Sequence, residues 1–140
     1  MNAVALTDSQ TVERLSLDLV RFLETGVAPE GLIAPEIFCD FSLPQWRLQT
    51  QGVDDVVALR RSGHPGPSSV TRWQSRPTDQ GFVFEFEERW EQDGQHWYSR
   101  ELLLVQVRDG RISELSVYCT GDWDQACQEQ HRREVTLIRP

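Results

Sequence analysis

The amino-acid sequence predicts an α+β domain in which helices cover one face of a strongly curved antiparallel sheet. Apolar residues at helical spacing in segment 11–25 predict the first helix. The second half of the chain carries three long alternating segments, joined by Asp-Gly pairs at 93–94 and 109–110. The 140 residues are expected to form a single domain, 1–140.

Segment 11–25 is expected to be an amphipathic helix that ends at Gly26, because glycine commonly follows the last turn of a helix. Its expected buried residues are Val12, Leu15, Leu19, Phe22 and Leu23.

Short elements follow, separated by proline and glycine. A turn at 29–33 is expected to precede strands at 36–43 and 46–51. A second helix opens at 52–55 and ends near Ser62, with acidic residues in its first turn and arginines in its last turn. The remaining predicted elements are a strand at 69–76, the long strands of 81–120, a helix at 123–133 and a tail or short strand at 135–140.

The Asp-Gly pair at 93–94 predicts a type I′ turn, and such a turn fixes the register of the strands beside it. Phe86 then lies opposite Glu101, and Glu88 lies opposite Ser99.

The second pair, at 109–110, predicts another type I′ turn. Counted from it without a bulge, Leu103 lies opposite Ser116 and Glu101 lies opposite Tyr118. Glu101 and Tyr118 would then share one face of the sheet.

This register predicts one face that mixes apolar and aromatic side chains with carboxylates, as in the wall of a small-molecule pocket. The residues expected to line the pocket are Trp73, Phe84, Phe86, Glu88, Trp90, Trp97, Ser99 and Thr120. For the tryptophans, simple core packing is the alternative interpretation.

The opposite face is expected to carry charge pairs and an apolar patch. The patch comprises Leu102, Leu104, Leu115 and Val117, and it predicts a homodimer interface.

The composition argues against several classes of function. A net charge of −8 and a pI near 4.8 disfavour binding to nucleic acid or to an anionic membrane, although acidity also serves solubility. No apolar run is long enough to span a bilayer, so a cytoplasmic location is expected. The three cysteines and three histidines show no metal-ligand spacing, and there is no nucleotide-binding motif. We therefore expect no metal and no cofactor.

The order of elements, with the closing sequence RDGRISELSVYCTGDW, resembles the nuclear transport factor 2-like superfamily and its SnoaL-like group. The resemblance covers nearly the whole chain. It implies a cone-shaped roll in which a curved sheet wraps around N-terminal helices and encloses a deep pocket. It also implies dimers formed through the outer face of the sheet, and relatives that include polyketide cyclases, isomerases, dehydratases and binding or assembly domains.

In cyclase-like and epoxide-hydrolase-like members, the last strand often carries an acid two positions after the aromatic residue. Thr120 occupies that position, and the next acid is Asp122. The arginines of the epoxide-hydrolase arrangement are expected on the outer face here, so that mechanism is disfavoured.

Glu101 and Tyr118 form the sharpest catalytic hypothesis. A carboxylate in a partly apolar site has a raised pKa and suits a general base, while a neighbouring tyrosine can stabilise an oxyanion. Asp122 is either an assisting acid or a cap of the C-terminal helix. The expected function is isomerase, cyclase or dehydratase chemistry on a small apolar carbonyl compound. Non-catalytic binding or assembly, with Glu101 and Tyr118 as a structural pair, is the alternative.

Overall fold

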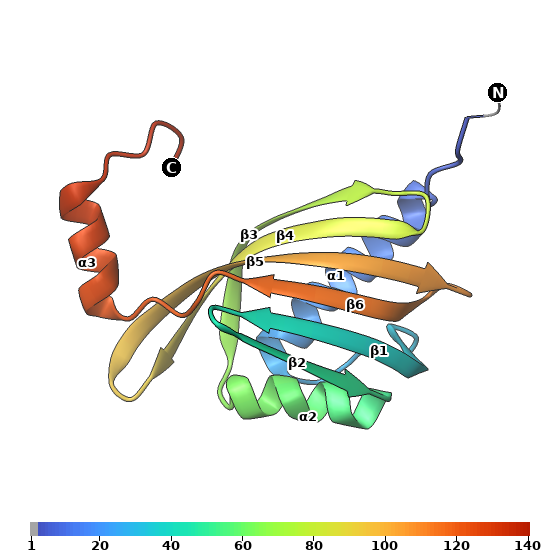
Figure 1. Cartoon of the computed structure of the whole chain (residues 1–140), viewed down its shortest axis with the longest axis horizontal. Helices are drawn as coiled ribbons and strands as arrows, with labels where there is room; N and C mark the ends of the chain where they lie inside the picture. Colours follow the sequence, from blue (N-terminus) through green and yellow to red (C-terminus); the bar gives the residue numbers. More distant parts are fainter. Residues whose placement is uncertain (1–2) are drawn as a thin grey trace.

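The computed structural model describes residues 3–140 (Figure 1). In chain order, the elements are α1 (Ser9–Thr25), β1 (Ile33–Leu43), β2 (Trp46–Gln51), α2 (Val53–Gly63), β3 (Ser68–Pro77), β4 (Gly81–Gln92), β5 (Gln95–Arg108), β6 (Arg111–Cys119) and α3 (Gln125–Glu134). The helices described for these residues are too short or too polar to cross a lipid bilayer.

The six strands form one curved sheet in the order β2-β1-β6-β5-β4-β3 (Figure 1). Neighbouring strands are antiparallel, except that β1 and β6 are parallel. The predicted α+β class with a curved sheet is therefore confirmed, and the sheet is mixed rather than wholly antiparallel.

Helix α1 covers one face of the sheet, which we call the inner face. Asp8 caps the helix by accepting a hydrogen bond from the backbone N–H of Thr11. Gly26 ends it in a left-handed conformation at φ 73°. The core that α1 forms with the sheet contains Val12, Leu15, Leu19, Phe22, Leu23, Phe82, Phe84, Phe86, Leu103, Val105 and Ile112. Every apolar residue predicted to be buried in the first helix lies in this core.

The β4–β5 hairpin has the predicted turn and register. Asp93 and Gly94 both have positive φ, at 54° and 74°, as a type I′ turn requires. Phe86 lies opposite Glu101, and Glu88 lies opposite Ser99.

The β5–β6 hairpin has the predicted turn, but its predicted register is wrong beyond a bulge. Asp109 and Gly110 have φ of 52° and 74°. Val107 pairs with Ile112 as predicted, whereas Gln106 pairs with Glu114. Ser113 is the extra residue, and an extra residue moves every later side chain of the strand to the opposite face.

The bulge reverses the predicted placements of the residues that follow Ser113. Leu115 and Val117 turn to the inner face, where Val117 is buried and Leu115 packs against the core. Tyr118 lies opposite Leu102 on the outer face and is 52% exposed, so it is not beside Glu101. Cys119 pairs with Glu101, in the place predicted for Tyr118.

Helix α3 lies beside the β4–β5 hairpin, apart from α1 and α2, and the tail after it turns back toward β3 (Figure 1). The helix is capped by Asp124, whose carboxylate accepts a hydrogen bond from the N–H of Cys127. Asp122, the other cap considered, is not the capping residue. Of the two structures expected for residues 135–140, a tail or a short strand, the tail is the correct one, because these residues form no strand.

Candidate functional site

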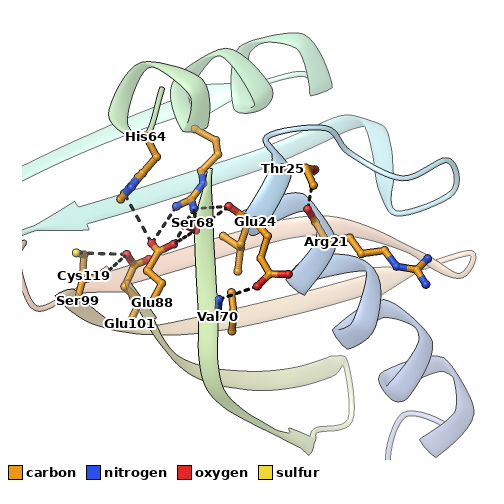
Figure 2. A network of polar contacts seen from close by, with 12 residues as sticks. Arg21, Glu24, Thr25, His64, Ser68, Val70, Glu88, Ser99, Glu101 and Cys119 are labelled. Atoms are coloured by element: carbon orange, nitrogen blue, oxygen red, sulfur yellow. Dashed lines mark hydrogen bonds and ion pairs between the residues drawn. The ribbon is translucent and has the colours of Figure 1, made fainter. Parts of the chain in front are cut away.

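A buried polar cluster lies where α2 and the following loop meet the inner face of the sheet (Figure 2). Its members are Arg60, His64, Ser68, Glu88, Ser99, Glu101 and Cys119. Three of these, Glu88, Ser99 and Glu101, come from adjacent positions on β4 and β5 that the Asp93-Gly94 turn brings together.

Arg60 and Glu88 form the fixed ion pair of this cluster. Nη1 of Arg60 donates to Oε1 of Glu88 at 3.1 Å, and Nη2 donates to Oε2 at 2.8 Å. Nη2 also lies 2.7 Å from the carbonyl oxygen of Leu23, at the end of α1. The Glu88 side chain is fully buried and that of Arg60 is 11% exposed, so the pair is shielded from water. Such a bidentate pair ties α1, α2 and β4 together.

Burial alone would raise the pKa of Glu88, but the hydrogen bonds and charge of Arg60 outweigh it and hold the pKa below its usual value. The hydroxyl of Ser68 adds a further hydrogen bond to Oε2 at 2.9 Å. Glu88 is therefore a buried anion at neutral pH.

His64 lies on the other side of Glu88. Its Nε2 is 3.7 Å from Oε1 of Glu88, and its ring packs edge-on against Trp90 with centroids 4.6 Å apart. Burial and the charge of Arg60 lower the pKa of His64 below its usual value, so the ring is neutral at pH 7. Its Nδ1 is buried and has no hydrogen-bond partner among residues 3–140.

Glu101 has weaker partners than Glu88. Its Oε1 accepts only long hydrogen bonds, from the Ser99 hydroxyl at 3.4 Å and the Cys119 thiol at 3.6 Å. It is 6% exposed. Burial, reinforced by the negative charge of Glu88, raises the pKa of Glu101 to about 8. Glu101 is therefore predominantly protonated at pH 7.

His64, Glu88 and Glu101 each offer one ligand atom, and these atoms lie within 4.8 Å of one another. This spacing would suit a cation, but the guanidinium of Arg60 already bonds both oxygens of Glu88. A metal ion there would face that positive charge at short range. The geometry fits a neutral carboxyl group beside an ion pair better than it fits a metal centre.

An inner cavity of about 70 Å³ opens beside Glu101, between the helices and the sheet. Its polar side chains are Glu101 and Arg60, and the other side chains are apolar apart from the thiol of Cys39. The main apolar lining residues are Leu19, Phe22, Ile37, Val56, Leu103 and Val117. Glu101 thus presents a neutral acid to a small apolar space.

Several residues predicted for the pocket do lie on the inner face. Phe84 and Phe86 are buried beneath α1, and the ring of Trp73 stacks on Phe84 with centroids 5.6 Å apart. Trp90 is buried and stacks on the half-buried Trp97, with centroids 6.3 Å apart. Trp90 packs against His64 of the polar cluster, and none of these five aromatic residues lines the inner cavity. Their predicted contact with a ligand stays a prediction.

Three predicted residues lie outside the cluster. Tyr118 is on the outer face because of the bulge at Ser113. Thr120 is exposed, and its hydroxyl donates to the carbonyl oxygen of Arg100. Asp122 is also exposed, although its charge still acts on His64. The pairing of Glu101 with Tyr118 is therefore wrong, and the group beside Glu101 is the Cys119 thiol.

The sequence reasoning missed Arg60, His64 and Ser68 as members of the site. Arg60 was interpreted only as one of the arginines in the last turn of the second helix, and His64 only as one of three histidines without metal-ligand spacing. A usable signal was present, because a carboxylate buried on an apolar face needs a cationic partner. Arginines at the end of α2 were the available candidates.

Comparisons with known proteins reveal similarity in structure alone. No family model and no curated protein matches the chain. A nuclear transport factor 2-like protein from Anabaena variabilis superimposes with a TM-score of 0.68 at 13% identity, over 86% of this chain and 97% of that one. A nuclear transport factor 2-like protein of unknown function from Mesorhizobium loti gives 0.61 at 23% identity, over 82% and 96%.

A candidate SnoaL-like polyketide cyclase from Jannaschia sp. CCS1 gives a TM-score of 0.63 at 12% identity, over 91% of this chain and 94% of that one. At these identities the likeness establishes the fold. The resemblance predicted from the sequence is thereby confirmed: the chain has the nuclear transport factor 2-like fold, the cone-shaped α+β roll that it shares with SnoaL-like proteins.

Proposed function

We propose that the protein binds a small, largely apolar carbonyl compound in the inner cavity, and that Glu101 exchanges a proton with it. The observation that carries this proposal is a buried carboxyl group with a pKa of about 8 at the wall of an apolar cavity. A neutral carboxyl group can donate a hydrogen bond to a carbonyl oxygen, and its ionised form can remove a proton from the adjacent carbon.

The chemistry proposed is of the isomerase, cyclase or dehydratase type. In an isomerisation, ionised Glu101 takes a proton from the carbon next to the carbonyl and returns it to another carbon, so no further reactant is needed. With a pKa of about 8, about one tenth of the molecules carry ionised Glu101 at pH 7. Activity of Glu101 as a base should therefore rise with pH and level off above pH 8.

The volume of the cavity restricts the substrate. Pockets for drug-sized ligands enclose roughly 300–1,000 Å³, and the inner cavity encloses about 70 Å³. This supports a compound of a few heavy atoms rather than a polycyclic one.

The same small volume favours a second candidate, a non-catalytic binding or assembly module. The outer face supports this alternative with exposed apolar side chains at Leu102, Leu104 and Tyr118. Leu115 and Val117, the other two residues of the predicted homodimer patch, face inward. A homodimer through the outer face would use Tyr118 in their place.

Hydrogen–deuterium exchange tests the proposal without knowledge of the natural substrate. Small ketones such as 2-butanone and cyclohexanone are incubated with the protein in deuterated water, and exchange at the carbon next to the carbonyl is followed by NMR. We expect the wild type to exceed Glu101→Gln by about a hundredfold or more, the lower end of the usual contribution of a general base. Glu129→Gln, which alters an exposed carboxylate on α3, is the matched control.

Methyl NMR signals of Leu103 and Val117 report binding in the same samples, since both residues line the cavity. Binding without Glu101-dependent exchange would favour the non-catalytic module. If no ketone binds and none exchanges, the pocket assignment is overturned.

A further inference from the structure

A second, larger cavity lies on the opposite side of the sheet from the inner cavity. It encloses about 440 Å³ between the outer face of β3, β4 and β5 and the segment formed by α3 and the C-terminal tail. Figure 1 shows α3 beside the β4–β5 hairpin, with the tail after it turned back toward the sheet. We call the cavity between this segment and the sheet the outer cavity.

The outer cavity is basic, although the protein is acidic. Five of the fourteen arginines line it, against two of the twenty-two acidic residues, in a chain with a net charge of −8. The arginines are Arg72, Arg89, Arg100, Arg132 and Arg139, and the acids are Glu85 and Glu87. Such a concentration of one charge in a concave site attracts an oppositely charged ligand.

Three of the arginines have partners within the protein. Arg100 lies 3.5 Å from Glu85 and 3.3 Å from Glu87, which accounts for both acids of the cavity. Arg72 donates to the carbonyl oxygen of Pro140 at 3.0 Å, which holds the tail against the sheet.

Arg89 donates to Gln128 of α3 at 3.2 Å, and its guanidinium lies 4.6 Å from the ring centroid of Tyr98. Arg132 and Arg139, in contrast, have no hydrogen-bond or ion-pair partner among residues 3–140. Two guanidinium groups therefore line the cavity with their donors free.

One wall of the outer cavity is aromatic. Trp123 packs against Tyr98 and His131, with ring centroids 5.2 Å apart in both pairs. All three residues line the cavity. Aromatic faces bind planar rings by stacking, and free guanidinium groups bind carboxylates and phosphates through paired N–H donors.

We propose that the outer cavity binds a small aromatic anion, in which a carboxylate or phosphate contacts Arg132 and Arg139 and a planar ring lies against Trp123. The volume of about 440 Å³ falls within the range of roughly 300–1,000 Å³ found for small-molecule pockets. The site is separate from the inner cavity, so it does not depend on any activity of Glu101.

NMR titration of the full chain tests the proposal with benzoate, phenyl phosphate, inorganic phosphate and benzylamine as probes. The indole N–H signal of Trp123, assigned with the variant Trp123→Phe, reports on the aromatic wall. We expect saturable shifts with benzoate and phenyl phosphate, weaker binding of inorganic phosphate, and none of benzylamine. Added salt should weaken binding of the anions.

The arginine variants make the test specific. The double variant Arg132→Ala/Arg139→Ala should weaken binding of phenyl phosphate by about tenfold or more. The control Arg133→Ala removes a neighbouring arginine of α3 that does not line the cavity, and it should change the affinity by less than about twofold.

An equal loss in Arg133→Ala would overturn the proposal, because the effect would then reflect the general charge of the helix. Binding of benzylamine as tight as that of benzoate would overturn the charge assignment. If inorganic phosphate and phenyl phosphate bind with equal affinity, the aromatic ring contributes nothing, and the proposal of an aromatic ligand is overturned. If the NMR shifts of Trp123 depend on the protein concentration and not on the probe, and sedimentation shows dimers, the outer cavity is a surface for self-association.

Discussion

Glu88 and Glu101, on neighbouring strands, each place a carboxylate oxygen within 4.8 Å of the other. Of these two carboxylates, Glu88 is the one that accepts hydrogen bonds from Arg60, so the pair is asymmetric. The pKa of Glu88 is lowered and that of Glu101 is raised to about 8. Two carboxyl groups with opposite shifts are typical of sites that hold one group ionised and the other neutral.

The first prediction concerns stability and pH. Glu101 has an ordinary pKa of 4.5 and a pKa of about 8 in the folded protein. Between these values the folded state binds more protons than the unfolded state, so its contribution to stability falls as pH rises. Glu101→Gln should remove a slope of up to about 1.4 kcal/mol per pH unit over that window. Urea unfolding at steps of roughly one pH unit from about pH 5 to about pH 9 measures this slope in the free energy of unfolding.

The exposed Glu129→Gln should retain the slope of the wild type. If Glu101→Gln and wild type lose stability in parallel as pH rises, Glu101 titrates near its ordinary value.

The second prediction concerns Arg60. Arg60→Ala would leave the fully buried Glu88 without a cation, and such a loss costs about 3–5 kcal/mol in the free energy of unfolding. Arg61→Ala is the matched control, since Arg61 is exposed and bonds only the carbonyl oxygen of Gly26. It should cost about 1 kcal/mol or less. Equal losses in chemical denaturation would contradict the assigned role of the ion pair.

The third prediction tests the bulge at Ser113. Val117→Ala should destabilise the protein by about 2 kcal/mol, because Val117 is buried beneath the helices. Tyr118→Ala should cost about 0.5 kcal/mol or less, because Tyr118 is exposed on the monomer. A regular strand would place these neighbours the other way round, so the reverse order of losses would refute the bulge.

The fourth prediction concerns the close approach of β4 to β5. A Cβ atom at Gly81 would overlap the carbonyl oxygen of Val105, where backbone rather than a flexible side chain would have to move. Gly81→Ala should therefore cost about 3 kcal/mol. Gly66→Ala, where the added atom meets nothing within 4 Å, should change stability by about 0.5 kcal/mol or less. Thermal unfolding of both variants would show whether β4 tolerates a side chain there.

The sequence predicted the fold wherever a local rule determined the geometry. Asp93 and Gly94 fix a turn of known hand, and the register counted from them is correct to the end of β4. Glu88, Ser99 and Glu101 were therefore placed on the inner face correctly. The ionic partners of Glu88 come from a separate helix, and no local rule specifies how that helix packs.

The bulge had a signal in the sequence that was interpreted otherwise. Ile112 is apolar at an even position, whereas Leu115 and Val117 are apolar at odd positions, so the alternation changes phase between them. We interpreted the later pair as a patch on the outer face. An equally simple interpretation is that one residue is inserted and all three face the core, as the structure has it.

The parallel pairing of β1 with β6 has a consequence for how the chain folds as it is synthesised. The hairpin of β1 and β2 emerges from the ribosome before its neighbour in the sheet, Arg111–Cys119, which is translated only after α2 and β3 to β5. Until then, the edge of β1 has unpaired backbone groups that can associate with other nascent chains. Contacts between residues so distant in sequence also slow folding. The hairpin of β1 and β2 therefore lacks its neighbour in the sheet until most of the domain has been synthesised.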